Sequence, residues 1–471
     1  MTDPTLMTLV DAADAVAAKK ISARELTEAC IVRAQTMQPT LNCFISLDPE
    51  GALAEADAAD AALARGAPLG PLHGVPLAHK DMYYRQGKIS TCGSKIRRDF
   101  VAQTTSTALT RLADAGALHM GGLNMSEFAV GPFGHNDHWG HCRNPWNPDH
   151  VTGGSSSGAG SSVGGRTVFG ALGSDTGGSV RLPAACCGLV GMKPTQTRVS
   201  RYGIMGLSFS LDNVGPLTRT VRDNARMLQQ IAGVDPNDPT TATAPVDDYE
   251  GATQNPDIKG LRIAIPRNYY YDAAAPEIRD LMTASLKVFE SLGAEIIEVD
   301  VTDHEEINTL ATVLRGPEAA TLHGAWLRDR PEDYGPQIRA RLEPGLAMAA
   351  THYVKALQLR PQISKRFIDA VFKNADVFHV PTIAMPVPSI AETDVQDGPD
   401  FPALVEAMTH CTRPFNYLGL PALAVPAGQS DNGLPASFQL VGRPFHEARL
   451  YRAAAAYESE TEFYATAPDM L

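Results

Sequence analysis

The sequence lacks the features that would suit a nucleic-acid or membrane partner. Lys and Arg number 40 against 53 Asp and Glu, so the formal net charge is -13, which repels a phosphate backbone. No stretch offers the run of about 20 uncharged apolar residues that a membrane-spanning helix requires. Residues 1–16 also lack the basic segment followed by an apolar run that marks a secretory signal. We therefore expect a cytoplasmic protein with no nucleic-acid and no membrane partner.

Cysteine is too scattered to form a disulfide framework. The chain has seven cysteines, an odd number without CxxC pairs, and we expect them to be reduced thiols. The loop GHNDHWGHC brings His135, His138, His141 and Cys142 close together in the sequence. The spacing HxxHxxHC is not a standard zinc pattern, and no carboxylate pair accompanies it. We therefore expect neither a metal site nor a cofactor.

What the sequence does contain predicts an α/β fold. Apolar residues recur at helical spacing from about 8 to 64, where Ser22 is the expected N-cap, with Glu25 three residues later. The segments LRIAIP, APEIRDLMTASLKVFESLGA and EIIEVDV, over 261–301, predict a strand, a helix and a strand of the kind that builds parallel sheets. Further expectations are a strand at 75–78, a helix at 213–233, mostly helical structure at 304–376, and strands at 377–388 and 422–428.

Three features indicate chemistry when they are taken together. Lys80 follows an apolar run, GGSSSGAG occupies 153–160, and GSDTGGSVRLPA occupies 173–184. The Gly/Ser loop has no lysine after its second glycine, so it does not match a phosphate-binding loop. The surroundings of Ser179, GGSVR, do not match the GxSxG nucleophile elbow, and nothing nearby supplies the Ser, Asp, His order of an α/β-hydrolase. These exclusions leave serine chemistry without histidine.

Lysine can act as the base in such chemistry only in its neutral form. Burial opposes the charged form of an amine and lowers its pKa, and the apolar run before Lys80 offers that environment. A second serine can then pass protons between Lys80 and a nucleophilic serine. We interpret the neighbouring His79 as a buried structural histidine; the alternative is a polar group that tunes Lys80.

The stretch GGSSSGAGSSVGGRTVFGALGSDTGGSVRLPA, residues 153–184, is similar to the long Gly/Ser signature of the amidase signature family. The segments GLNMSEFAVG, GLVGMKPT, SLDNVGPLTRTVRD and GLPALAVPAG also resemble family segments, so the resemblance covers roughly the whole chain. It implies one amidase signature domain over 1–471, with a central mixed β-sheet surrounded by helices. The region at about 240–400 matches least, and we expect it to supply the variable substrate pocket.

The resemblance also implies a Ser-cisSer-Lys triad. Ser179 matches the family's nucleophile, Ser155 its bridging serine held in a cis peptide, and Lys80 its base. The family's oxyanion hole is matched by the backbone N–H groups of Thr176, Gly177, Gly178 and Ser179.

Further residues have expected roles around these groups. We expect Asp175 and Arg181 to orient the backbone of the signature, and Cys186 and Cys187 to be small buried side chains. Arg360 has two interpretations, because it either binds a substrate carboxylate or pairs on a helix face. Substrate contacts are expected from Ala129, Val130, Gly131 and His135.

The expected function is hydrolysis of the acyl C–N bond of a small or medium non-peptide amide, such as a carboxamide, anilide, hydrazide or carbamate, through an acyl-enzyme on Ser179. The alternative is the glutamine-hydrolysing A subunit of a tRNA-dependent amidotransferase, which GSDTGGSVR and RVSRYG also resemble and which would pass ammonia to a partner protein. The intact Lys80, Ser155 and Ser179 disfavour a non-enzymatic binding module. We expect a small-molecule substrate and, as the commonest closed assembly, a homodimer, although the sequence does not determine the oligomeric state.

Overall fold

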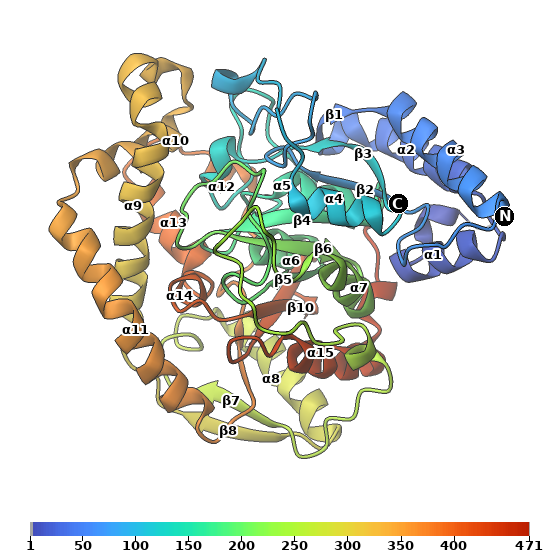
Figure 1. Ribbon diagram of the computed structural model, residues 1–471. Coiled ribbons are helices and arrows are strands. Elements are labelled where there is room, and N and C mark those ends of the chain that lie inside the picture. The colour runs from blue at the N-terminus through green and yellow to red at the C-terminus, as the bar shows by residue number, and fades with distance from the viewer. Residues whose placement is uncertain (1–2, 471) are drawn as a thin grey trace.

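An 11-stranded mixed β-sheet forms the centre of the structure, a computed structural model that describes residues 3–470 (Figure 1). The strand order is β1-β3-β2-β4-β6-β5-β10-β11-β9-β7-β8. Helices surround the sheet, so the predicted α/β fold is confirmed. The strands are β1 (Phe44–Leu47), β2 (Pro76–Lys80), β3 (Leu118–Leu123), β4 (Gly170–Asp175), β5 (Val190–Lys193), β6 (Asn213–Thr218), β7 (Arg262–Pro266), β8 (Glu295–Val299), β9 (Val377–Pro381), β10 (Ala422–Gln429) and β11 (Pro435–Val441).

The helices are distributed on both sides of this sheet. In Figure 1, α1 to α3 lie on one side of the molecule near β1, and α9 to α11 line the other side. The α-helices of the described chain are α1 (Leu9–Ala17), α2 (Ala23–Leu41), α3 (Pro49–Ala64), α4 (Thr107–Asp114), α5 (Ser157–Gly164), α6 (Arg181–Cys187), α7 (Val221–Ile231), α8 (Pro276–Ser291), α9 (His304–Asp329), α10 (Pro336–Leu342), α11 (Ala350–Phe372), α12 (Ile390–Thr393), α13 (Phe401–Thr409), α14 (Arg413–Tyr417) and α15 (Glu447–Thr461).

The central strands place the ends of β2 and β4 beside each other. Every residue of both strands is buried, as expected when helices cover both faces of a sheet. The two strands pair in parallel, with Ala78 opposite Ala171. Their carboxyl ends, Lys80 and Asp175, therefore lie at the same edge of the sheet.

Small residues in the Gly/Ser stretch allow close packing beneath this edge. A Cβ atom on Gly158 would lie 2.4 Å from the carbonyl oxygen of Cys43, and one on Gly173 would lie 2.6 Å from Ser156 Oγ. A larger side chain at either position would therefore separate α5 from the strands that it covers.

Several predicted elements are confirmed. Ser22 caps α2 in a capping box with Glu25. The unit predicted over 261–301 is β7, α8 and β8, and the two strands pair in parallel with Ile263 opposite Ile296. The predicted helical content of 304–376 is present as α9, α10 and α11.

The helix predicted over 213–233 is wrong for its first residues. Asn213–Thr218 form β6, which pairs antiparallel with both β4 and β5. The helix α7 begins at Val221, because Thr220 caps it by accepting a hydrogen bond from the backbone N–H of Asp223. Gly and Pro within β6 are poor helix formers, and the neighbouring strands satisfy the backbone groups instead.

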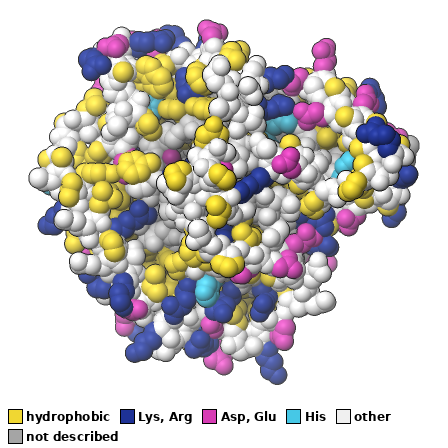
Figure 2. All heavy atoms as spheres, viewed as in Figure 1, with side chains coloured by type: hydrophobic (Ala, Val, Ile, Leu, Met, Phe, Trp, Pro, Cys, Tyr) yellow, Lys and Arg dark blue, Asp and Glu magenta, His cyan; other side chains and the backbone are white. Residues whose placement is uncertain are grey.

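The cysteine side chains are all buried, and none forms a disulfide in the described chain. Within residues 3–470, no helix combines the length and the apolar character needed to cross a bilayer. On the face shown in Figure 2, basic and acidic side chains are interspersed.

Candidate active site

Lys80 is the last residue of β2, and its amino group is held in the protein interior. Its side chain is only 1% exposed, and Nζ donates hydrogen bonds to Ser155 Oγ at 2.7 Å and to Ser174 Oγ at 2.8 Å. Burial lowers the pKa of Lys80 to about 7, although the nearby carboxylates of Asp212 and Asp175 favour its charged form. A substantial fraction of this lysine is therefore neutral near pH 7.

Ser155 is positioned by an unusual stretch of backbone. The peptide bond between Gly154 and Ser155 is cis. The carbonyl of Ser155 accepts a hydrogen bond from Ser126 N–H at 3.1 Å, and Gly154 N–H donates to the carbonyl of Pro132 at 2.6 Å. These bonds tie the Gly/Ser loop to the segment that precedes it and fix Ser155 beside Lys80.

Ser179 lies in the turn between β4 and α6, which a buried ion pair organises. Asp175 accepts hydrogen bonds from the backbone N–H groups of Gly178 at 2.8 Å and Val180 at 3.2 Å. The same carboxylate pairs with Arg181 at 3.0 Å, and both side chains are fully buried. Burial alone would raise the pKa of Asp175, but the Arg181 guanidinium outweighs it and the pKa is about 2. Asp175 is therefore ionised and holds the turn in place.

The same turn offers backbone donors to a reacting carbonyl oxygen. The N–H group of Gly178, predicted to take part in the oxyanion hole, is instead directed to Asp175. Within residues 3–470, the N–H groups of Thr176, Gly177 and Ser179 have no hydrogen-bond acceptor. These three groups remain available, so Gly178 acts in this conformation as a structural part of the turn.

A cavity of about 510 Å³ opens beside this turn and contains the side chain of Ser179. We call it the Ser179 cavity. Thr176 and Gly177 line it together with Ala129, Val130 and Gly131, which the sequence placed at the substrate. Much of the remaining wall comes from α9, α10, the residues at 344–348 and the segment 397–413, and Pro132, Leu182, Leu207 and Leu211 complete it. The cavity therefore draws on the variable region, where we expected the substrate pocket.

His135 does not line the Ser179 cavity. Its ring is buried, and Nε2 lies 2.9 Å from Thr393 Oγ1. The nearby His141 instead lies 3.2 Å from a carboxylate oxygen of Asp394. Among residues 3–470, no group of three or more His, Cys, Asp and Glu side chains is arranged to hold a metal ion. The histidine loop is thus packed against the segment around α12.

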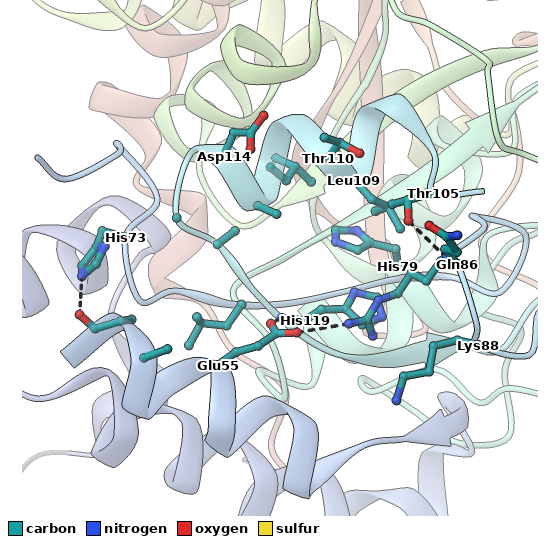
Figure 3. Close-up of a pocket in the computed structure, with 18 residues that line it drawn as sticks. Glu55, His73, His79, Gln86, Lys88, Thr105, Leu109, Thr110, Asp114 and His119 are labelled. Atoms are coloured by element: carbon teal, nitrogen blue, oxygen red, sulfur yellow. Dashed lines mark hydrogen bonds and ion pairs between the residues drawn. The ribbon is translucent and has the colours of Figure 1, made fainter. Parts of the chain in front are cut away.

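His79 faces away from the amino group of Lys80, because successive residues of a strand point to opposite faces of the sheet. Its Nδ1 accepts a hydrogen bond from Leu172 N–H at 3.1 Å, and burial lowers the pKa of His79 to about 3. The ring lines a second cavity of about 600 Å³ together with His119 and Glu55 (Figure 3). The imidazoles of His79 and His119 stack at a centroid distance of 5.3 Å. His79 is therefore a neutral structural residue here.

Arg360 also lies outside the Ser179 cavity. Its guanidinium donates to the backbone carbonyls of Tyr417, Ser210 and Asn416, which occupy all three of its nitrogens. It therefore joins α11 to α14 and to the loop that contains Ser210, and the interpretation as a carboxylate-binding residue is not supported.

Two kinds of site residue were missed from the sequence. Ser174 binds Lys80, and only the pairing of β2 with β4 reveals this contact. Arg315, Arg341 and Arg413 line the Ser179 cavity. Residues 304–376 contain many arginines, but the sequence alone does not tell which of them face the cavity.

Comparisons with known proteins identify the family of this chain. The Amidase family model matches residues 25–451. The A subunit of the glutamyl-tRNA(Gln) amidotransferase of Moorella thermoacetica is 38% identical, over 98% of this chain and 98% of the relative. Its counterpart from Geobacter metallireducens is 37% identical, over 97% of this chain and 98% of the relative.

Solved structures share the fold. A chain from a vestigial protein complex, described as revealing the evolutionary origins of an s-triazine catabolic enzyme, superposes with a TM-score of 0.90 at 32% identity, covering 97% of this chain and 99% of that one. A crystal structure of an amidase superposes with a TM-score of 0.86 at 31% identity, covering 96% and 100%. With a family match along most of its length and the signature at its centre, this chain belongs to the amidase signature family of enzymes.

Proposed function

We propose that this protein hydrolyses the acyl C–N bond of a small amide through an acyl-enzyme on Ser179. The observation that carries the proposal is the contact of 2.7 Å between Lys80 Nζ and Ser155 Oγ, made by a lysine whose pKa is about 7. A buried neutral amine beside a serine is a proton acceptor at physiological pH. Ser179 in the adjoining cavity is then the nucleophile that this base activates.

The proposed reaction has two halves. Neutral Lys80 takes the proton of Ser155 as Ser155 takes that of Ser179, and Ser179 Oγ attacks the acyl carbon. The N–H groups of Gly177 and Ser179 donate to the resulting oxyanion. When the C–N bond breaks, the leaving nitrogen receives its proton through Ser155, and an ester on Ser179 remains. Water then adds to this ester with the same relay, which releases the acid and restores the serine.

The relatives favour the second interpretation of the sequence over a standalone amidase. The two relatives named above belong to glutamyl-tRNA(Gln) amidotransferases and match this chain along nearly its full length. By this analogy the chain would release ammonia from an amide for use by a partner protein. Its partners would then include other proteins as well as a small-molecule substrate.

The test is turnover of an amide panel by wild type and by Ser179→Ala, measured as ammonia from primary amides and glutamine, as aniline from anilides and as hydrazine from hydrazides. We expect turnover by wild type and none by the variant. Hydroxylamine should divert the reaction to the hydroxamate, because it competes with water for the acyl-enzyme. Turnover retained in Ser179→Ala would exclude the proposed nucleophile. Glutamine hydrolysis that appears only with an added partner would support the amidotransferase role, whereas efficient turnover of other amides by the chain alone would support the standalone one.

A further inference from the structure

Three arginines from three separate elements line the wall of the Ser179 cavity. Arg315 comes from α9, Arg341 from α10, and Arg413 from the start of α14. Burial, together with the charge of Arg413, lowers the pKa of Arg315 to about 10, and burial with the charges of Arg315 and Arg413 lowers the pKa of Arg341 well below its usual value. The three guanidinium groups therefore repel one another across a space partly withdrawn from water.

Among the described residues, Arg413 is the one of these three arginines that has an acidic partner. Arg413 pairs with Glu406 at 2.6 Å and also donates to Thr409. Among residues 3–470, neither Arg315 nor Arg341 has a carboxylate within 4.0 Å. Arg315 Nη1 is moreover buried and has no hydrogen-bond partner in the part of the chain that the structure describes.

The two unpaired arginines stand out because the protein has many acids. Its formal net charge is -13, and most other partly buried arginines in it find a carboxylate or backbone carbonyls. The remaining acid on the cavity wall, Asp397, is exposed to solvent. An unpaired charge withdrawn from water is costly, so a fold that places two of them in one cavity gains from an anion that binds there.

We propose that Arg315 and Arg341 bind a carboxylate on the acyl part of the substrate, so that the preferred substrate is the monoamide of a dicarboxylic acid. Guanidinium groups suit this role, because their planar N–H donors match the two oxygens of a carboxylate. The inference rests on the proposed function, since it takes the amide end of the same molecule to lie at Ser179.

The charge of the cavity also predicts how well glutamine serves as a substrate. Glutamine would bring an ammonium group along with its carboxylate, and the Glu406 carboxylate that lines the wall is already paired with Arg413. A substrate with the carboxylate and without the ammonium matches the positive wall better. We therefore expect glutaramate, the amide that differs from glutamine by the missing amino group, to be the better substrate.

The experiment compares kcat/KM for glutaramate, succinamate, glutamine and the neutral butyramide. We expect the two monoamides to exceed butyramide by about 10- to 100-fold, the range for losing a charge-assisted hydrogen bond. Arg315→Gln and Arg341→Gln should each reduce the ratio of succinamate to butyramide by a similar factor. Arg339→Gln is the matched control, because Arg339 lies on the same helix as Arg341 but pairs with Glu343 at the surface.

Three results would overturn the inference. These are a higher kcat/KM for butyramide or glutamine than for glutaramate, an equal loss on charged and neutral amides in the arginine variants, and an Arg339→Gln variant with the same change in ratio. Calorimetric binding of succinamate and butyramide to Ser179→Ala separates this inference from the proposed function, since binding needs no turnover. Succinamate that binds no tighter than butyramide refutes the carboxylate site alone, whereas tight binding of succinamate without wild-type turnover refutes the reaction alone.

Discussion

Replacing Lys80 by methionine tests the base in the proposed mechanism. Methionine has a similar length and fills the buried space, but it cannot accept a proton or bind Ser155 and Ser174 as the amine does. Loss of a general base lowers turnover by about 100- to 10,000-fold. We therefore expect ammonia release by Lys80→Met to fall by at least about 100-fold, with thermal unfolding showing that the variant is folded.

The pH dependence of the wild-type enzyme makes this prediction quantitative. With a pKa of about 7, about half of the Lys80 side chains are neutral at pH 7. With an ordinary lysine pKa of about 10.4, only about one in 2,500 would be neutral. Because the neutral amine is the active form, kcat/KM should fall as the pH drops below 7 and level off above about pH 8.

Lys193 provides the matched control for this titration. It is also buried, its pKa is lowered to about 7 by burial, and its Nζ binds the carbonyl of Pro194 outside the Ser179 cavity. In Lys193→Met the fall in kcat/KM below pH 7 should therefore keep its midpoint. A wild-type kcat/KM that stays constant from pH 5 to 9, or a Lys80→Met variant with the wild-type profile, would refute the assignment of Lys80 as the base.

Three further substitutions test the surroundings of the triad. Asp175→Asn should lower the free energy of unfolding at pH 7 by about 3 to 5 kcal/mol, because it leaves Arg181 buried without its ion pair. Since the pKa of Asp175 is held at about 2, below its unfolded value, the stabilisation by this carboxylate should be present above about pH 4 and disappear as the pH falls toward 2 in denaturant titrations. Gly178→Ala should lower kcat by about 100-fold with a smaller change in KM. The φ angle of Gly178 is 130°, which alanine rarely adopts, so the substitution should shift the turn and misplace the proposed oxyanion donors. A variant with the wild-type kcat would contradict this. His79→Leu should lower the free energy of unfolding by about 1 to 3 kcal/mol, because it leaves Leu172 N–H without its acceptor. The midpoint of the pH profile of kcat/KM should stay in place. A shifted midpoint would show that His79 alters the pKa of Lys80.

The candidate catalytic residues could be proposed from the sequence because they lie in short segments with distinctive patterns. Ser155 and Ser179 lie in one stretch of small residues, and the apolar strand before Lys80 indicates its burial. Local patterns also predicted the capping box at Ser22 and the parallel strands around α8, since hydrogen bonds between near neighbours and apolar periodicity determine such features.

Sequence patterns could not predict the features that contacts between distant parts of the chain determine. β6 contains glycine and proline inside a segment that otherwise reads as helical, and its pairing with β4 and β5 makes it a strand. Arg360 was considered for carboxylate binding, yet three backbone carbonyls occupy its guanidinium. His135 Nε2 lies 2.9 Å from Oγ1 of Thr393, a residue 258 positions away in the chain.

The sequence by itself determined the family, and it predicted the type of bond and the three candidate catalytic residues, because the residue types and their spacing indicate that chemistry. The tertiary structure determined which contacts and charges surround these groups and which side chains line the cavity. Parallel pairing of β2 with β4 places Ser174 Oγ beside the amine of Lys80, and the carboxylate of Asp175 accepts the N–H of Gly178, which the sequence predicted to donate to the oxyanion. Folding also brings Arg315 and Arg341 to one wall from separate helices. Electrostatic interaction depends on distance in space and on burial, and neither quantity can be read from positions along the chain.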